Sequence, residues 1–335
     1  MGQVKDSLGR TIRDLRISVT DRCNFRCKYC MPAEIFGPNY PFLPKKQILT
    51  FEEISRLAKI FSLLGTIKLR ITGGEPLLRR DLPLLVKMLC ELGGYEDIAL
   101  TTNGYLLSKY AKKLIDSGLK RVTISLDSLS ETTFKNMNGG IASVQDVAKG
   151  IEAAIEAGLY VKINVVVQKG VNEDQIIPIA EYGHKLGINT RFIEFMDVGN
   201  HNKWVEGKVF SARDILKVLK SKFSLEPIRP SYRGEVAQRY RESGSSWEIG
   251  IISSITKPFC QDCSRARISA DGHVFTCLFG TKGFDIRTHM RKGLDDHDLM
   301  CLISKIWTQR KDKYSEDRAL LRDTLEKVEM HHIGG

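Results

Sequence analysis

A strand-then-helix rhythm repeats from about residue 13 to residue 222 and leaves few folds open to the chain. Six runs have the length and composition of strands, at residues 15–20, 67–72, 97–102, 121–126, 160–167 and 190–195. Helical patterns, such as residues 51–64 and 108–118, lie between them. Six strand–helix units predict an α/β fold with a parallel sheet, either doubly wound or curled toward a barrel.

Four of the predicted strands carry a polar face at the strand period of two. The polar positions are Arg16, Ser18, Thr20, Lys68, Arg70, Thr72, Thr123, Ser125, Lys162 and Asn164. Strands of a parallel sheet are normally buried on both faces and read as nearly continuous apolar runs, so a polar face is unusual. Exposure of a sheet edge to solvent could explain the polar face of a single strand. Because burying several cations is unfavourable unless an anion meets them, four together favour a polar barrel interior that holds an anionic ligand.

The rhythm changes after residue 222. From about residue 225 to residue 285 the chain has short β-like pieces, and two helices are expected at residues 296–310 and 315–328. We therefore predict two domains, with the strand–helix units in residues 1–222 and a smaller β-rich extension in residues 223–335. The chain ends in HHIGG, which on sequence alone reads as a frayed terminus.

The composition narrows the possible partners of the chain. Its 42% hydrophobic and 27% charged residues are typical of a globular protein. No apolar stretch approaches the ~20 residues of a membrane span, and the N-terminus lacks the apolar core of a signal peptide, so we expect a cytoplasmic protein without a membrane partner. The net charge of +11 suits an anionic partner. Because this charge is spread along the chain, nucleic acid is not expected.

Six of the eight cysteines fall into two tight groups. The first is C-x3-C-x2-C and the second is C-x2-C-x13-C, made respectively by Cys23, Cys27 and Cys30 and by Cys260, Cys263 and Cys277. Thiols of a cytoplasmic chain stay reduced, so both groups predict metal binding and not disulfides. Cys90 and Cys301 lie in apolar helical stretches and are interpreted as small core residues.

Each group supplies three thiolates, one short of a closed zinc site. His273 or Cys301 could complete a zinc site for the second group. Thiolates also select iron–sulfur clusters, and a [4Fe–4S] cluster on three cysteines keeps one iron open for a small molecule. Arg265 and Arg267 lie two residues apart inside the second group, so both can point the same way from a strand and suit a phosphate or a purine edge.

The stretch TGGEPLL, residues 72–78, directly follows the second predicted strand. Its two glycines permit close backbone approach to a ligand, and Glu75 adds an acceptor. Together with the first cysteine loop, this stretch resembles the radical SAM superfamily. The resemblance implies a partial (βα)6 TIM-like barrel of the radical SAM type, with a [4Fe–4S] cluster on Cys23, Cys27 and Cys30. S-adenosylmethionine (SAM) would chelate the open iron and be cleaved to a 5′-deoxyadenosyl radical, with its amino group bound at the GGEP turn.

The two cysteine spacings, the stretch SRARIS and the terminal Gly-Gly are similar to the radical SAM enzymes that open molybdenum cofactor biosynthesis. This resemblance implies a second [4Fe–4S] cluster on Cys260, Cys263 and Cys277, whose open iron would bind the guanine base of GTP. The implied SAM contacts are Tyr29, Gly74, Glu75, Ser125 and Met196, and the implied GTP contacts are Arg16, Arg70, Thr101, Lys162, Arg265 and Arg267. Gly334 and Gly335 would reach into the active site, and with the first three cysteines, Arg265 and Arg267 they form the implied catalytic set.

The reaction implied by this resemblance is a cyclisation of the lyase class. The adenosyl radical abstracts the ribose 3′ hydrogen of GTP, and the carbon radical attacks C8 of guanine to give (8S)-3′,8-cyclo-7,8-dihydroguanosine 5′-triphosphate. The chain has no P-loop motif, so a P-loop hydrolase is not supported. The implied partners are a reducing electron-donor protein, the next enzyme of the pathway, which receives the product, and a second copy in a homodimer.

Two other hypotheses stay open. A radical SAM enzyme that modifies peptides could carry an auxiliary cluster, although such enzymes usually have more C-terminal cysteines than the three in this group. A zinc-stabilised nucleic-acid-binding protein would fit the isoelectric point of 9.2 and the clustered thiols. It would contain zinc and bind nucleic acid, but it would leave the strand–helix rhythm, the GGEP turn and the buried cations unexplained.

Overall fold

The computed structural model describes residues 4–322 and 324–334. The strands are β1 (Asp14–Ser18), β2 (Lys68–Thr72), β3 (Asp97–Thr102), β4 (Arg121–Ser125), β5 (Tyr160–Val167), β6 (Asn189–Glu194), β7 (Leu225–Ile228), β8 (Gln238–Glu242), β9 (Glu248–Ile252), β10 (Arg265–Ile268), β11 (His273–Phe275) and β12 (Phe284–Asp285). The α-helices are α1 (Phe51–Leu63), α2 (Leu82–Glu91), α3 (Leu107–Asp116), α4 (Glu131–Asn138), α5 (Val144–Glu156), α6 (Ile176–Lys185), α7 (Ala212–Lys220), α8 (Ile286–Arg291), α9 (Asp296–Thr308), α10 (Tyr314–Leu321) and α11 (Met330–Ile333).

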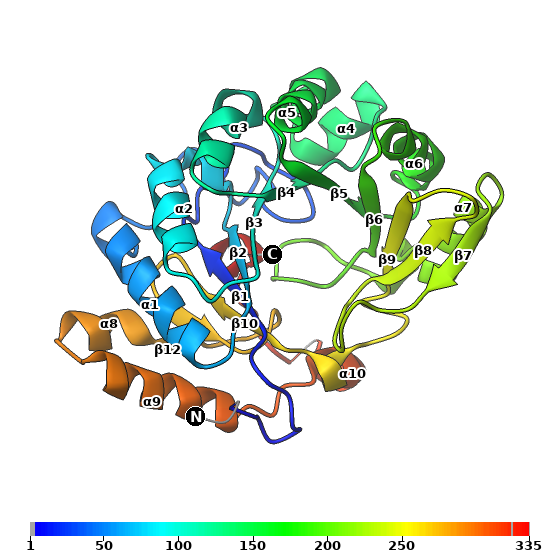
Figure 1. The fold of residues 1–335 in the computed structure, drawn as a ribbon. Helices are drawn as coiled ribbons and strands as arrows, with labels where there is room; N and C mark the ends of the chain where they lie inside the picture. The colour runs from blue at the N-terminus through cyan, green and yellow to red at the C-terminus, as the bar shows by residue number, and fades with distance from the viewer. Residues whose placement is uncertain (1–3, 323, 335) are drawn as a thin grey trace.

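All the strands belong to one sheet with the order β12-β11-β10-β1-β2-β3-β4-β5-β6-β9-β8-β7. From β1 to β6 the strands pair in chain order, and every one of these pairs is parallel. The sheet curves into an open arc, with α1 to α6 along its outer side (Figure 1). This arrangement confirms the predicted barrel-like α/β fold.

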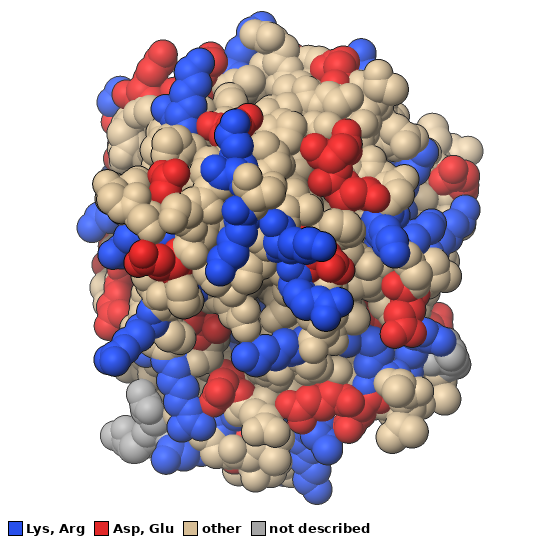
Figure 2. All heavy atoms as spheres, turned by 90° about the vertical axis from the view of Figure 1, so that its right-hand side faces the viewer, with Lys and Arg blue, Asp and Glu red and all other residues tan. Residues whose placement is uncertain are grey.

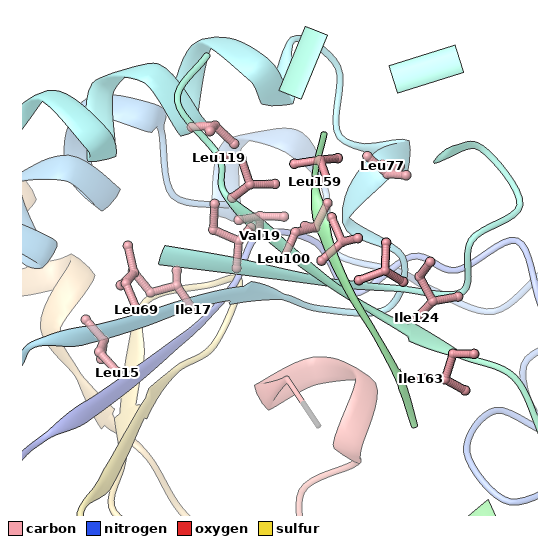
Figure 3. Packing of buried hydrophobic residues seen from close by; sticks show 14 of the residues in the cluster. Leu15, Ile17, Val19, Leu69, Leu77, Leu100, Leu119, Ile124, Leu159 and Ile163 are labelled. Carbon is pink, nitrogen blue, oxygen red and sulfur yellow. The ribbon is translucent and has the colours of Figure 1, made fainter. Parts of the chain in front are cut away.

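The apolar faces of the parallel strands form the core between the sheet and the outer helices. Leu15 and Ile17 of β1 and Val19 just after it are fully buried, and they share a core cluster with Leu69 of β2 and Leu100 of β3 (Figure 3). Burial of such side chains stabilises a fold by roughly 1.5–3 kcal/mol each. The opposite face of each strand is thereby turned toward the inside of the arc.

Helix α1 begins at a cap that its own sequence provides, and it buries its apolar residues in the core. Thr50 caps its N-terminus, since the Thr50 hydroxyl accepts from the Glu53 amide (3.2 Å) and the Glu53 carboxylate accepts from the Thr50 amide (2.8 Å). This reciprocal capping box fixes where the helix begins. Its apolar residues, including Ile54, Leu57 and Phe61, recur at helical spacing and are buried against the sheet.

The C-terminal extension continues the sheet at both of its ends. Strand β10 pairs parallel to β1, and β9 pairs parallel to β6, while β11, β12, β8 and β7 add antiparallel strands beyond them. The predicted β-rich extension is therefore present. The predicted boundary between residues 222 and 223 stays a prediction, although the sheet runs across it.

Helix α9 corrects the interpretation of Cys301. That cysteine was expected in the core, but it is exposed, with its sulfur 3.7 Å from Nε2 of His297. The buried positions of α9 include Leu299, Ile303 and Ile306. Residue 301 lies two positions from Leu299, which places it on the opposite side of the helix.

One face of the molecule carries mixed charge. On the side of the molecule where β7 and β8 lie, Lys and Arg side chains are interspersed with Asp and Glu (Figure 2). Among the helices of the described ranges, none is both long enough and apolar enough to cross a membrane.

Candidate active site

An internal cavity lies inside the arc of strands, and both cysteine groups line it. Most of the predicted ligand contacts line it too: Arg16, Tyr29, Arg70, Gly74, Thr101, Ser125, Met196, Arg265 and Arg267. Of the predicted residues that the structure describes, Glu75, Lys162 and Gly334 are not part of the lining. Gly335 lies outside the described residues. The fold thus brings two cysteine groups 230 residues and more apart in the sequence to one space.

The first cysteine loop is fixed by its own backbone and by Arg26. The Cys30 amide donates to the Cys27 carbonyl (2.9 Å), and Nη1 of Arg26 donates to the Cys23 carbonyl (2.7 Å). Burial raises the pKa of Cys23 to about 12, and it also raises the pKa values of Cys27 and Cys30. Because buried thiols of this kind ionise when a cationic centre binds them, the loop suits a metal cluster.

The two glycines of the GGEP turn pack on the chain that leads into the cysteine loop. The Gly74 amide donates to the Thr20 carbonyl (2.8 Å). Gly73 has a φ of +143°, and a Cβ on it would clash with the Thr20 carbonyl. A Cβ on Gly74 would clash with the Arg22 carbonyl. Both positions therefore require glycine, and the turn and the cysteine loop form one unit.

Glu75 is buried and binds the loop that follows β3. One carboxylate oxygen accepts from the Leu77 amide (3.0 Å) and the Thr102 hydroxyl (2.8 Å). The other accepts from the Asn103 amide (2.7 Å), and the Asn103 side chain lies 3.9 Å from the sulfur of Cys23. Burial raises the pKa of Glu75 to about 7. Both oxygens are used within the chain, and the role of Glu75 toward SAM stays a prediction.

Tyr29 is held at the cavity wall by Asp127, a residue that the sequence did not single out. The Tyr29 hydroxyl donates to Oδ2 of Asp127 (2.6 Å), whose Oδ1 accepts from the Val166 amide (2.8 Å). Burial raises the pKa of Asp127 to about 6. The pair fixes the phenol between the cysteine loop and the ends of β4 and β5.

The second cysteine group lies among arginines. The Cys263 amide donates to the Cys260 carbonyl (3.1 Å), and Nη2 of Arg265 lies 3.2 Å from the sulfur of Cys263. Although burial acts to raise it, the pKa of Cys263 is lowered to about 6 by the charges of Arg265 and Arg310. Burial raises the pKa of Cys277 to about 12. The chain itself thus stabilises one thiolate of this group.

A row of arginines crosses the inner face of the sheet. The registers of β10, β1 and β2 place Arg267, Arg16 and Arg70 side by side. Burial, together with repulsion from Arg265, lowers the pKa of Arg267 to about 9, and burial with repulsion from Arg121 lowers that of Arg70 to about 10. In the described part of the chain, the guanidiniums of Arg16 and Arg70 make no hydrogen bond or ion pair. Partly buried guanidiniums without a partner, turned toward a cavity, indicate an anionic ligand.

Two uncharged groups of the cavity also have no partner. Oγ1 of Thr101 and Oδ1 of Asn164 are buried and form no hydrogen bond with the described residues. Both residues line the cavity. Because buried polar atoms are nearly always hydrogen-bonded, these two also point to a ligand.

Arg191 and Tyr232 line the cavity as well, and neither was predicted. The register of β5 and β6 places Arg191 beside Asn164. The alternation of polar and apolar residues in β6, aligned with that in β5, could have identified Arg191 from the sequence. The Tyr232 ring covers the ammonium of Lys68 at 3.5 Å and the guanidinium of Arg13 at 4.8 Å. Tyr232 lies in the irregular segment between β7 and β8, where no periodic pattern marks it.

The C-terminal segment ends inside the arc of strands (Figure 1). Gly334 has a φ of +75°, a Cβ on it would clash with Thr72, and its carbonyl accepts from Nη1 of Arg267. Upstream, Nζ of Lys327 donates to Oδ2 of Asp197 (2.9 Å), which anchors the segment to the loop after β6. The tail is therefore docked in the barrel and not frayed.

Three thiols can contribute either to a site for a single metal ion or to an iron–sulfur cluster. In the described ranges, no three or more His, Cys, Asp or Glu side chains are arranged as a site for a single metal ion. In an iron–sulfur cluster each thiolate binds its own iron, so the sulfurs need not meet at one point. Six cavity-lining thiols in two groups of three fit such clusters.

The chain is similar to known proteins both in sequence and in fold. Models of the Radical SAM superfamily and of Molybdenum Cofactor Synthesis C match residues 17–183 and 188–316. GTP 3′,8-cyclases of Staphylococcus aureus strains bovine RF122 / ET3-1 and JH9 are 48% and 47% identical over 337 residues, covering 99% of this chain and of each relative. SuiB of Streptococcus suis bound to S-adenosylmethionine has a TM-score of 0.66 at 15% identity, covering 92% of this chain and 68% of that chain, which shows a shared fold.

Proposed function

Because this chain belongs to the GTP 3′,8-cyclases, the radical SAM enzymes of molybdenum cofactor biosynthesis, we propose that its cavity holds SAM beside the first cysteine group and GTP beside the second. Family membership accounts for SAM and for one iron–sulfur cluster. We assign a [4Fe–4S] cluster to each group, on Cys23, Cys27 and Cys30 and on Cys260, Cys263 and Cys277. The thiols of both groups line one cavity, which supports the second assignment.

The observation that carries the proposal is the row of Arg267, Arg16 and Arg70 in that same cavity. A triphosphate would supply the negative charge that this row lacks, and arginine binds phosphate oxygens through paired hydrogen bonds. Thr101 and Asn164 would complete their hydrogen bonds on the nucleotide. These contacts hold GTP without attacking its phosphates, as a cyclisation at the ribose and base requires.

When bound, SAM and the first cluster would supply a 5′-deoxyadenosyl radical, the chemistry needed to remove the ribose 3′ hydrogen and let C3′ bond to guanine C8. The chain itself orients the reactants and excludes water. Tyr29, held by Asp127, fixes the wall beside the first group. Arg267 donates to the Gly334 carbonyl and so connects the proposed GTP site to the docked C-terminal tail.

The electrons that the reaction consumes and the product that it releases imply two protein partners. Reductive cleavage of SAM consumes one electron, and the nucleotide radical left after C3′ bonds to C8 consumes a second electron and a proton, so a reducing donor protein must supply both electrons. The cyclised triphosphate is an intermediate that a second enzyme must consume. The predicted homodimer is a further proposal that comes from the family resemblance.

The test is an anaerobic assay of the chain reconstituted with iron and sulfide. With SAM and dithionite we expect GTP-dependent 5′-deoxyadenosine and a cyclised triphosphate of unchanged nucleotide mass. Arg16→Ala should raise the KM for GTP by about tenfold or more, as loss of a charged hydrogen bond predicts, and leave the KM for SAM unchanged. Arg56→Ala, which breaks an exposed ion pair with Asp296, serves as the matched control. If the amount of 5′-deoxyadenosine did not depend on GTP, the substrate assignment would be overturned.

A further inference from the structure

A cluster of charged side chains holds the backbone of the second cysteine group, and two of its members, Arg310 and Asp312, also line the cavity. Nη1 of Arg10 donates to the carbonyl of Cys260 (2.8 Å) and to the carbonyl of Asp312 (2.8 Å). Nη1 of Arg310 donates to the carbonyl of Cys263 (2.6 Å). Two arginines from opposite ends of the chain thus hold the backbone of the first two cysteines of this group.

The third cysteine is held through its neighbour in the chain. The hydroxyl of Thr276, which directly precedes Cys277, donates to Oδ2 of Asp312 (2.5 Å). The same carboxylate oxygen lies 3.3 Å from Nε of Arg310. All three cysteine segments are therefore tied to one set of side chains.

The set is mostly buried and its charges pair with one another, although the Asp312 side chain is 35% exposed. The side chains of Asp6, Arg10 and Arg310 are 0%, 2% and 1% exposed. Oδ2 of Asp6 lies 2.5 Å from Nε of Arg10 and 3.6 Å from Nη1 of Arg310. Trp307 packs against the Arg310 guanidinium at 4.5 Å, and its indole nitrogen donates to the Arg10 carbonyl (2.8 Å).

We propose that Asp6, Arg10, Arg310 and Asp312 are positioning residues that preset the second cysteine group for its cluster. Burying two guanidiniums is unfavourable unless they form hydrogen bonds, and here those bonds end on the carbonyls of two cysteines and on Asp312, which also accepts from Thr276. Residues that orient ligands in this way commonly decide how tightly a metal centre is held. This inference rests on the proposed second cluster.

The arrangement also explains how the N-terminus contributes to a site formed 250 residues later. Residues 6–10 fold back on Asp6, whose Oδ1 accepts from the amides of Leu8 (2.9 Å) and Arg10 (2.8 Å). The second group is therefore complete only when the N-terminal segment and the end of α9 have packed together.

The experiment counts iron and sulfide per chain after anaerobic reconstitution. The wild-type chain is expected to hold about eight irons, four in each cluster. Arg10→Lys keeps the charge but cannot reach both carbonyls, and Thr276→Val removes the bond to Asp312. Both variants should lose up to half of the iron, while the effect of SAM on the electron paramagnetic resonance spectrum of the first cluster stays unchanged.

Arg318→Lys is the matched control, because Arg318 forms a buried pair with Asp197 (2.8 Å) and, among the described residues, donates to no cysteine. It should lower the melting temperature comparably and keep all the iron. Full iron in Arg10→Lys and Thr276→Val would overturn the positioning role. If Arg10→Lys does not fold, Thr276→Val decides alone. A wild-type chain with only four irons, unaffected by Cys263→Ala, would instead overturn the proposed second cluster, a result that is distinguishable from failure of the positioning role.

Discussion

Lys162 is a cation whose charge depends on what binds near it. Burial, followed by repulsion from Arg191 and Arg121, lowers the pKa of Lys162 to about 7. Lys162 is not part of the cavity lining, but its neighbour Arg191 is, and a triphosphate bound there would favour the ammonium form and raise this pKa, so that binding takes up a proton. The affinity for GTP should therefore fall as pH rises above about 7. We expect the KM for GTP to increase several-fold between pH 6.5 and pH 8.5 in initial-rate assays.

The Lys162→Arg variant removes the titrating group, since a guanidinium stays charged throughout this range. Its KM for GTP should be nearly independent of pH. The KM for SAM, measured in the same assays, controls for general effects of pH. An equal slope in the variant and the wild-type chain would assign the titration to another group.

Glu75 gives a prediction about stability. Its pKa is raised by burial from 4.5 to about 7 in the folded chain, so its ionised form is the less stable one there. The contribution of Glu75 to stability is therefore complete below about pH 4.5 and is lost as pH rises through about 7, by about 3 kcal/mol in total. Thermal unfolding of the metal-free chain at pH 5 and pH 8 should show this loss.

The Glu75→Gln variant should lack that dependence. Its amide would face the Asn103 amide, a donor, and leave it without an acceptor, which costs roughly 1–3 kcal/mol. The variant is expected to melt at a lower temperature than the wild-type chain at pH 5, with the difference shrinking at pH 8. A difference that does not change with pH would show that Glu75 keeps an ordinary pKa.

At the scale of elements, the C-terminal segment depends on one buried carboxylate. Asp197 accepts from the hydroxyl of Tyr314 (2.5 Å), Nε of Arg318 (2.8 Å) and Nζ of Lys327 (2.9 Å). Lys327→Met should loosen the segment, because breaking a buried pair costs about 3–5 kcal/mol. We expect cyclised product to fall about tenfold or more while deoxyadenosine is still formed.

The loosened segment can be measured apart from activity. Carboxypeptidase should remove the last residues of Lys327→Met faster than those of the wild-type chain. Lys222→Met, which breaks only an exposed pair with Glu181, controls for the loss of a lysine. Equal digestion of all three proteins would refute the anchoring role.

The tail itself requires glycine. Gly334 combines a φ of +75° with a position where a Cβ would clash with Thr72. Gly334→Ala should reduce cyclisation strongly, and removal of Gly334 and Gly335 should abolish it while both clusters remain. Gly293→Ala is the control, since Gly293 has a φ of +91° but open space around it. Full product formation by the truncated chain would contradict this prediction, whatever its cluster content.

The sequence predicted the elements whose signal is local and missed those set by distant contacts. The strands from β1 to β6 were predictable from apolar runs, and Arg16 and Arg70 were predictable from the strand period of two. The position of the second cysteine group depends on the pairing of β10 with β1, which no local pattern marks. Asp127, Asp197 and Tyr232 act through partners far along the chain, so only the fold reveals them. On sequence alone the C-terminal tail is interpreted as a frayed end, because the residues that hold it also lie far from it along the chain.

At the scale of the molecule, strands of the two predicted domains pair with one another, which bears on whether the domains fold independently. Strand β1 pairs with β10 on one side, as in Leu15 beside Ala266, and β6 pairs with β9 on the other, as in Phe192 beside Ile251. A fragment of residues 1–222 would keep all six parallel strands and lose both of these neighbours. Its two outer strands would become exposed edges, which promote association between chains.

We therefore expect the fragment of residues 1–222 to aggregate or to lack a cooperative melting transition, although it contains the whole first cysteine group. Size-exclusion chromatography and thermal circular dichroism of the fragment would measure this. The chain without residues 334–335 is the control, because it keeps every strand and should elute and melt like the full chain. A fragment that stays monomeric, melts cooperatively and binds about four irons would show that the parallel strands form an independent domain. The extension would then serve the second cluster and the tail, and β9 and β10 would not be needed to complete the barrel.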